Sequence, residues 1–236
     1  MYGVRSLIFY VGLTLVTVIY VVILALLLPF PARIRNRSLT GWSGFVLWWL
    51  GVSCDLHFRV EGRENIPPGP AVVLAKHQSA WETIAMQQVF PAQTWVLKRS
   101  LLWIPFFGWG LAMTRPVAID RGAGKKALRQ VIEQGTRRLR AGLWMIIFPE
   151  GTRVAPGEKG RYAVGGSMLA KQAGVPVVPV AHNAGAYWPK QGFTKKPGII
   201  TIAVGPTIDT RDRTAAEVNR KAEAWIESRM ATLPTS

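Results

Sequence analysis

The stretch AVVLAKHQSAWETIAMQQ, residues 71–88, changes from a continuous apolar run to a helix-like pattern within a few positions. Residues 71–75 predict a short buried strand, and residues 81–88 predict the opening of a helix. Five helical steps of ~100° would leave His77 and Glu82 ~140° apart around one continuous helix, too far round to touch. We therefore expect His77 to lie on the turn before the helix and to face Glu82.

The pairing of a histidine with a carboxylate provides a general base and its orienting partner. Taken alone, His77 and Glu82 are a weak indication, because a histidine beside an apolar strand is usually a core or surface residue with a hydrogen bond. Ser79 is a rival nucleophile, but it lacks the glycine-flanked turn that exposes a serine in hydrolases. The pair gains weight only from other polar segments of the chain.

Short strands and helices alternate on both sides of this stretch. Residues 57–62 alternate like an edge strand, and the apolar run 143–148 is typical of a strand buried on both faces of a sheet. Further strands are predicted at residues 94–98, 118–121, 175–181 and 199–205, and further helices at residues 125–141, 165–173 and 214–231. This order predicts an α/β domain with a mixed central sheet flanked by helices.

No charged residue occurs between Arg5 and Arg33. The apolar residues 7–28 would reach ~33 Å as a helix, enough to cross a hydrocarbon core of ~30 Å. The run ends in LLPFP rather than in a small-residue cleavage site, which favours a retained membrane helix over a signal peptide. Arg33, Arg35 and Arg37 follow it, and by the positive-inside rule they place the rest of the chain in the cytoplasm.

A second apolar run covers residues 42–52 and contains three tryptophans, the residue type enriched at the lipid headgroup level. It is too short to span a bilayer comfortably, so we expect a helix that lies in the interface or returns as a hairpin with the first. A buried helix of the globular domain is the alternative. The resulting division is residues 1–53 as membrane-anchoring helices and residues 54–236 as the α/β domain.

The composition limits the chemistry of the protein. A single cysteine, Cys54, excludes an internal disulfide. His57, His77 and His182 lie in different segments without metal-ligand spacing, so no metal site is predicted. Lys and Arg number 29 against 13 Asp and Glu, so the surface will attract phosphates, anionic lipid or acidic proteins, with nucleic acid as a rival partner.

Residues 148–153, FPEGTR, directly follow the strand predicted to be most buried. Their polar groups should emerge at the carboxyl end of that strand, where open α/β sheets bind ligands. A free amide near Gly151 could donate to the oxyanion of a tetrahedral intermediate, and Arg153 could hold a phosphate. The alternative is a strand-ending turn closed by an ion pair between Glu150 and Arg153.

Residues 75–83, 117–121 and 148–153 together resemble the glycerolipid acyltransferases, the family of bacterial 1-acyl-glycerol-3-phosphate acyltransferases, over roughly residues 72–180. The resemblance implies an enzyme of the bacterial inner membrane with its catalytic domain facing the cytoplasm. It would move a fatty acyl group from acyl-CoA or acyl carrier protein to the sn-2 hydroxyl of lysophosphatidic acid, which gives phosphatidic acid.

The resemblance also assigns roles to residues. His77 would remove the proton of the acceptor hydroxyl without a covalent acyl-enzyme, and Glu82, where the family more often has aspartate, would orient the ring. The implied substrate-binding residues are Lys98, Arg121, Glu150, Gly151, Thr152 and Arg153, with Arg121 and Arg153 as candidate ligands of the acceptor phosphate. The implied partners are a lysophospholipid, an acyl thioester and the bilayer, with acyl carrier protein as a candidate donor and no nucleic acid or cofactor.

Two kinds of alternative stay open. Within the enzyme class, the acceptor is another lyso-lipid, such as a lyso-ornithine lipid, or glycerol 3-phosphate. From another class, the protein is a basic membrane-tethered binding protein for anionic lipid or nucleic acid, although such a protein has no use for His77 paired with Glu82.

Overall fold

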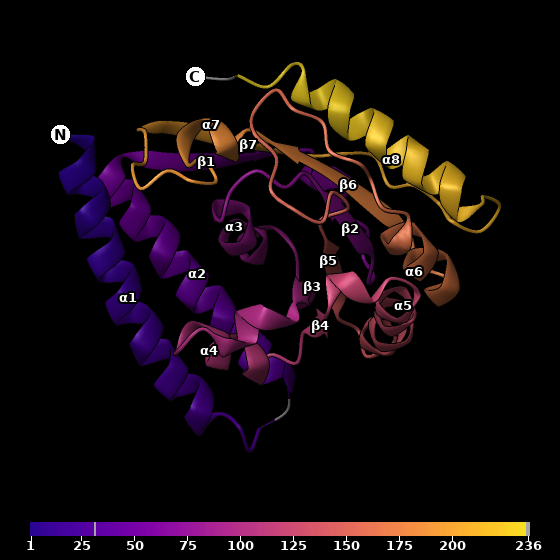
Figure 1. The fold of residues 1–236 in the computed structure, drawn as a ribbon, viewed down its shortest axis with the longest axis horizontal. Helices are drawn as coiled ribbons and strands as arrows, with labels where there is room; N and C mark the ends of the chain where they lie inside the picture. Colours follow the sequence, from indigo (N-terminus) through magenta and orange to yellow (C-terminus); the bar gives the residue numbers. More distant parts are fainter. Residues whose placement is uncertain (31, 235–236) are drawn as a thin grey trace.

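Two long helices form a hairpin along one side of an α/β domain (Figure 1). This computed structural model describes residues 1–30 and 32–234, without the side chains of residues 32, 33, 36, 37 and 121. The helices are α1 (Tyr2–Leu26), α2 (Ala32–Cys54), α3 (Trp81–Val89), α4 (Phe107–Met113), α5 (Lys125–Arg140), α6 (Gly165–Ala173), α7 (Ala184–Tyr187) and α8 (Ala215–Met230), with short 3₁₀ turns η1 (Arg63–Asn65), η2 (Arg99–Trp103) and η3 (Arg121–Ala123).

A single seven-stranded sheet forms the centre of the domain, in the order β1-β7-β6-β2-β5-β3-β4. Its strands are β1 (Leu56–Glu61), β2 (Val72–Ala75), β3 (Gln93–Lys98), β4 (Val117–Ile119), β5 (Trp144–Ile147), β6 (Val177–His182) and β7 (Gly198–Val204). The strands from β6 to β4 run parallel, whereas β7 pairs antiparallel to β6 and parallel to β1. The predicted α/β domain with a mixed sheet is confirmed, and β1 lies at an edge as expected.

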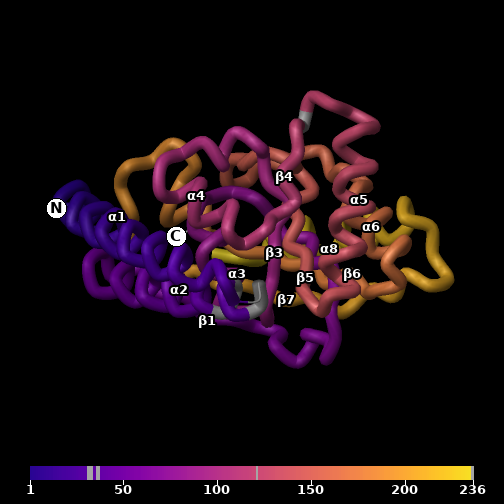
Figure 2. Tube along the Cα trace, turned by 90° about the horizontal axis from the view of Figure 1, so that it is seen from below, coloured from indigo at the N-terminus to yellow at the C-terminus, as the bar shows by residue number. Residues whose placement is uncertain are grey.

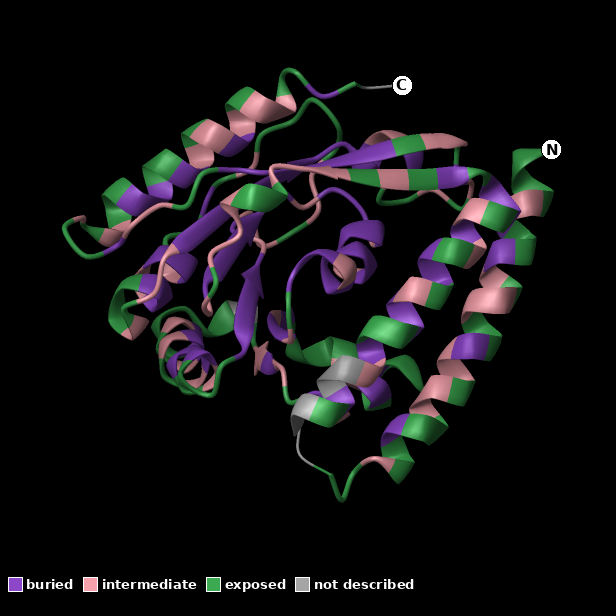
Figure 3. Cartoon of the chain, turned by 180° about the vertical axis from the view of Figure 1, so that it is seen from behind, coloured by how far each residue is buried: buried purple, intermediate pink, exposed green. Residues whose placement is uncertain are grey.

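The central strands have apolar side chains on both faces because each face is covered by helices (Figure 3). Val73 and Ala75 of β2 belong to a core shared with α2 and α3. Their neighbours Val72 and Leu74 point the other way, into a core shared with α5, α6 and α8. Since side chains alternate along a strand, two apolar cores require the continuous apolar runs seen in the sequence.

The second helix of the hairpin is longer than the apolar run at residues 42–52 predicted. It begins at Ala32, in a polar segment whose arginines give no helical apolar pattern. Arg35 explains this start, because its buried guanidinium donates to the carbonyl oxygens of Leu28 and Phe30, after the end of α1, and to that of Met113, the last residue of α4. Arg35 therefore connects segments inside the protein and is not a free charge at the surface.

The two hairpin helices approach closely where one of them carries a glycine. A side chain at Gly12 of α1 would collide with the indole of Trp49 of α2, and one at Gly41 of α2 would meet the Tyr20 hydroxyl at 2.8 Å. The predicted hairpin is thus held by close packing of small residues against aromatic rings.

Helix α1 contacts the α/β domain at both of its ends (Figure 2). Near its start, the Ser6 hydroxyl accepts from the backbone amide of Lys195 at 2.9 Å. The buried Lys195 ammonium lies 3.6 Å from the ring centroid of Tyr10 and 4.5 Å from that of Trp188, in a cation–π arrangement. Near the end of α1, Leu24 packs beside Gly110 of α4. The hairpin therefore lies along the domain over the length of α1.

The aromatic segment at residues 101–111 lies in η2, α4 and the turn between them, and much of its surface is exposed. Trp103 is 81% exposed and Trp109 is 50% exposed. Helix α1 is long and apolar enough to cross a membrane, and only 17% of its most apolar window is buried. The outward side chains of α1 are Val4, Leu7, Ile8, Val11, Leu15, Ile19, Val22, Ile23 and Leu26.

Candidate active site

His77 lies in the turn between β2 and α3 and faces Glu82, as the spacing predicted. Its Nδ1 is 2.8 Å from Glu82 Oε1. The backbone amides of Gln78 and Ser79 donate to the same oxygen at 2.9 and 2.8 Å. The Ser79 hydroxyl accepts from the amide of Trp81, where α3 begins, so it serves the helix start. The first turn of α3 is thus built around the Glu82 carboxylate.

The Glu82 carboxylate is completely buried, yet it is ionised at neutral pH. Burial alone would raise its pKa, but the hydrogen bonds from His77 and from the amide of Ser79 outweigh burial, so the pKa of Glu82 is lowered. A carboxylate can only accept, so in the neutral form of His77 the hydrogen is on Nδ1 and Nε2 has the lone pair. This is the tautomer that a general base needs.

The His77 ring is also fixed from one side. It stacks on the Phe148 ring with centroids 4.1 Å apart and planes 14° apart. The side chain is 13% exposed. With Nδ1 bound to Glu82, the remaining nitrogen, Nε2, is the one left to meet a substrate.

A mostly apolar cavity of about 280 Å³ reaches His77 between the hairpin and the sheet. The hairpin contributes Thr17, Tyr20, Val21, Leu24, Leu39 and Trp42, and the domain contributes His77, Ser79, Ala80, Thr83, Ile84, Gln87, Trp95, Val96, Leu97, Leu101, Phe107, Gly110, Leu111, Phe148 and Arg153. The charged side chain of Arg153 shares this cavity with His77. Such a space suits a molecule with an aliphatic chain and a polar, anionic end.

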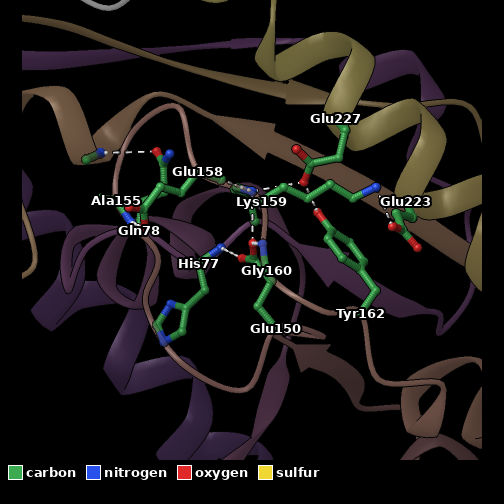
Figure 4. Close-up of polar contacts among 12 residues, drawn as sticks. His77, Gln78, Glu150, Ala155, Glu158, Lys159, Gly160, Tyr162, Glu223 and Glu227 are labelled. Atoms are coloured by element: carbon green, nitrogen blue, oxygen red, sulfur yellow. Dashed lines mark hydrogen bonds and ion pairs between the residues drawn. The ribbon is translucent and has the colours of Figure 1, made fainter.

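Glu150 occupies a different position from the one expected of a substrate-binding residue. Its carboxylate is fully buried, and one oxygen accepts from the His77 backbone amide at 2.9 Å (Figure 4). The other oxygen lies 2.8 Å from the Lys76 ammonium and accepts from the Gly160 amide. Glu150 therefore holds the backbone of the turn that carries His77, and its ion pair is with Lys76 instead of Arg153.

The rest of FPEGTR lies beside His77. The Gly151 amide donates to the Phe148 carbonyl at 3.0 Å, so this amide is not free for an oxyanion. Gly151 has a φ of 68°, which the tight turn needs and glycine permits. Thr152 is exposed and Arg153 half-buried, and the next amide, that of Val154, donates to the His77 carbonyl at 2.8 Å.

Lys98 and Arg121 lie further along the carboxyl edge of the sheet. Lys98 ends β3 and is exposed, and it does not line the cavity. Arg121 follows β4, which pairs with β3, but its side chain lies outside the described part of the chain. Strand β5 separates both positions from β2 and His77. The structure thus brings together His77, Glu82 and Arg153 and leaves Lys98 at the rim.

Two buried residues of the site were not expected from the sequence. His182 ends β6, and its Nε2 lies 2.8 Å from the Lys76 carbonyl oxygen. Burial lowers the pKa of His182 more than the neighbouring Glu82 raises it, so the ring is neutral and Nε2 donates. Lys76 itself is 1% exposed. A lysine within an apolar run could have indicated a buried ion pair, whereas His182 has only its strand-end position as a signal.

Metal ligation was not predicted, and within residues 1–30 and 32–234 the structure gathers no group of three or more His, Cys, Asp and Glu side chains able to hold an ion. His57 is exposed, and its Nε2 lies 3.2 Å from the Asp55 carboxylate.

Comparison with known proteins gives a consistent result. The profile of the family described as "Acyltransferase" matches residues 57–183. A 1-acyl-sn-glycerol-3-phosphate acyltransferase of Pseudomonas aeruginosa is 46% identical over 213 residues, which cover 89% of this chain and 82% of that protein. The human 1-acyl-sn-glycerol-3-phosphate acyltransferase beta is 30% identical over 192 residues, covering 78% of this chain and 66% of that protein. The crystal structure of the 1-acyl-sn-glycerophosphate acyltransferase PlsC from Thermotoga maritima has a TM-score of 0.82 and 24% identity, and the match covers 98% of this chain and 95% of that one.

Proposed function

Because the chain belongs to the acyltransferase family, we propose that it is an enzyme that transfers a fatty acyl group from a thioester to the sn-2 hydroxyl of lysophosphatidic acid. The observation that carries the proposal is the His77–Glu82 pair at the end of an apolar cavity that also holds Arg153. The relative from Pseudomonas aeruginosa, which bears the name of this activity, supports the choice of acceptor.

The reaction uses groups of this chain without a resident cofactor. His77 Nε2 takes the proton of the acceptor hydroxyl as the oxygen attacks the thioester carbonyl. The ionised Glu82 stabilises the imidazolium that forms. When the tetrahedral intermediate collapses, the carbon–sulfur bond breaks and the proton passes from His77 to the leaving thiolate, which restores the neutral ring.

The substrates divide between the two characters of the site. The apolar cavity binds the acyl chain of the acceptor, and the Arg153 guanidinium binds the phosphate of the acceptor. Thr152, and Lys98 and Arg121 further along the sheet edge, are candidates for additional contacts with the headgroup. Acyl-CoA and acyl carrier protein are both suitable donors. A lyso-ornithine lipid lacks the phosphate that would occupy Arg153, and glycerol 3-phosphate lacks a chain for the cavity, so lysophosphatidic acid fits both features best.

The protein is proposed to lie on the cytoplasmic face of the bacterial inner membrane. The outward apolar face of α1 and the exposed aromatic side chains of α4 provide a surface for lipid. Because the domain contacts α1 at Ser6 and again at Leu24, α1 is proposed to rest in one leaflet, which differs from the membrane-crossing helix first expected. Because Arg35 is internal, the cytoplasmic orientation is supported by Arg33 and Arg37, the other two arginines that follow the first helix.

A transfer assay with purified protein tests this function. Lysophosphatidic acid, other lyso-lipids and glycerol 3-phosphate are offered with acyl-CoA or acyl carrier protein donors, and the acylated lipid is measured. We expect lysophosphatidic acid to be preferred and His77→Ala to lower kcat by about 10²- to 10⁴-fold. His57→Ala, at an exposed histidine, is the matched control and should keep wild-type turnover. Vesicle binding without transfer by any donor and acceptor would favour the binding-protein alternative instead.

A further inference from the structure

A chain of polar contacts, buried at Lys76 and Glu150, connects the C-terminal helix α8 to the backbone of His77 (Figure 4). The Glu227 carboxylate of α8 lies 2.9 Å from the Lys76 ammonium. The same ammonium lies 2.8 Å from Glu150, which accepts the His77 amide. Glu227 thus reaches the catalytic turn through two buried side chains, although it lies 151 positions from Lys76 in sequence.

Lys76 is fully occupied at the centre of this chain of contacts. Its ammonium donates to Glu227 at 2.9 Å and to the carbonyl oxygen of Glu158 at 3.0 Å, and it forms an ion pair with Glu150. Glu227 is fixed in turn by the Tyr162 hydroxyl, which donates to it at 2.7 Å. Burial and the carboxylate of Glu227 raise the pKa of Tyr162, so this hydroxyl keeps its hydrogen.

The arrangement leaves Lys76 with two carboxylates and Glu150 with one lysine. If Glu227 were absent, the ammonium would lose one of its two charged partners and the restraint that holds it in line with Glu150. A buried polar network that is only partly satisfied loses its fixed geometry. The group that would shift is the Glu150 carboxylate, and with it the amide of His77.

We propose that Lys76 and Glu227 are positioning residues that hold the catalytic base, so that the C-terminal helix takes part in the active site. The inference rests on the proposed acyl transfer for its kinetic test. Neither residue lines the cavity that reaches His77, so each acts through Glu150 and not on a substrate.

A second cavity of about 280 Å³ lies beside Lys76 and Glu227. It allows a direct test of the relay, by which we mean the contacts from Glu227 through Lys76 and Glu150 to the His77 amide. Lys76 and Glu227 line the cavity together with Gln78, Asn183, Met230 and Leu233. A small carboxylate such as formate could therefore enter and replace the carboxylate removed in Glu227→Ala.

The test compares Glu227→Ala with a matched variant on the same helix. Glu223→Ala removes a carboxylate one turn earlier in α8, which pairs with the exposed Lys159 at 2.7 Å and makes no contact with Lys76. We expect Glu227→Ala to lower kcat about tenfold or more, the size of one charge-assisted hydrogen bond, with KM for thioester and lyso-lipid unchanged. Glu223→Ala should leave both constants unchanged. Formate should restore kcat in Glu227→Ala and have no effect on Glu223→Ala.

Two further measurements keep the outcome decisive. Glu227→Gln keeps an acceptor oxygen and the side-chain volume, so it serves if the alanine variant fails to fold, and we expect a kcat loss of a few fold, about that of weakening one such bond. Wild-type kcat in either folded Glu227 variant, or an equal loss in Glu223→Ala, would overturn the inference. The His77 amide resonance tests the relay without turnover, because Glu227→Ala should shift it and Glu223→Ala should not. If the wild type transfers no acyl group, the proposed function fails while this resonance still decides the relay.

Discussion

Replacing Glu82 with glutamine tests the charge of the catalytic pair while keeping its shape. One carboxylate oxygen of Glu82 accepts from His77 and from two backbone amides. The amide oxygen of glutamine can take that place, but the charge that stabilises the imidazolium is lost. A hydrogen bond to a charged group contributes ~1.5–3 kcal/mol, which corresponds to a fall in kcat of about 10- to 150-fold.

The same substitution also affects stability, because both carboxylate oxygens of Glu82 are used. The second oxygen accepts from the Ser79 amide at 3.0 Å, and in glutamine an NH₂ group would face that N–H. Two opposed buried donors cost ~1–3 kcal/mol of unfolding free energy. The lowered pKa of Glu82 means that its contribution is complete above its ordinary value of 4.5 and is lost as the pH falls through the folded-state pKa. The stability difference between wild type and Glu82→Gln should therefore shrink in acid.

The assay measures kcat of wild type and Glu82→Gln with saturating thioester and lysophosphatidic acid. The unfolding free energy of both proteins is measured in the detergent solution used for the assay. Glu133→Gln, at an exposed carboxylate that pairs with Arg129, makes the same chemical change on the surface and should alter neither quantity. Glu82→Asp adds a test of reach, since the turn is closed around the longer side chain and we expect a loss close to that of the amide. Wild-type kcat in Glu82→Gln would refute the role of the carboxylate, and an unchanged unfolding free energy would refute the donor clash.

Four other changes have expected outcomes. Arg153→Ala should raise KM for lysophosphatidic acid about 10-fold or more and leave KM for the thioester nearly unchanged, because one charge-assisted contact is lost; equal effects on both substrates would indicate a structural role. Gly110→Val should narrow the cavity against α1, where an added Cβ would lie 3.4 Å from a side chain, and lower kcat/KM most for the longest-chain acceptors in a chain-length series of lysophosphatidic acids. Gly12→Ala should push the helices apart at Trp49 and lower the unfolding free energy by ~1–3 kcal/mol in thermal or denaturant unfolding. The folded-state pKa of the buried His182 ring lies below its ordinary value of 6.5, so the unfolding free energy of wild type falls as the pH drops below 6.5. His182→Gln removes this titration, and its unfolding free energy should fall less over the same pH range. Parallel curves of unfolding free energy against pH for the two proteins would contradict this.

The sequence was sufficient for the features that depend on near neighbours. Buried strands such as residues 72–75 and 144–147 are apolar at every position because both faces of the sheet are covered, and this leaves a clear run. The contact of His77 with Glu82 followed from five residues of chain and the geometry of a helix. In each case the deciding contacts lie within one element or one turn.

The features that the sequence did not predict depend on distant partners. Glu150 looked like a substrate ligand because its local motif resembles one, but its partner Lys76 follows a different strand, β2. The start of α2 was hidden by its arginines, since Arg35 is satisfied by carbonyl groups that include that of Met113, 78 positions away. Local polarity cannot distinguish a charge that faces solvent from one that ties two elements together.

The bond between Ser6 and Lys195 joins residues 189 positions apart. During translation the first helix leaves the ribosome long before its partner loop has been made. At ~5–20 residues per second that interval is ~10–40 s. Throughout it, an apolar helix of 25 residues has no domain to rest on, so we expect lipid or a chaperone to cover it first. Docking of the N-terminus onto the loop that carries Lys195 would then be among the last steps of folding, completed at the membrane.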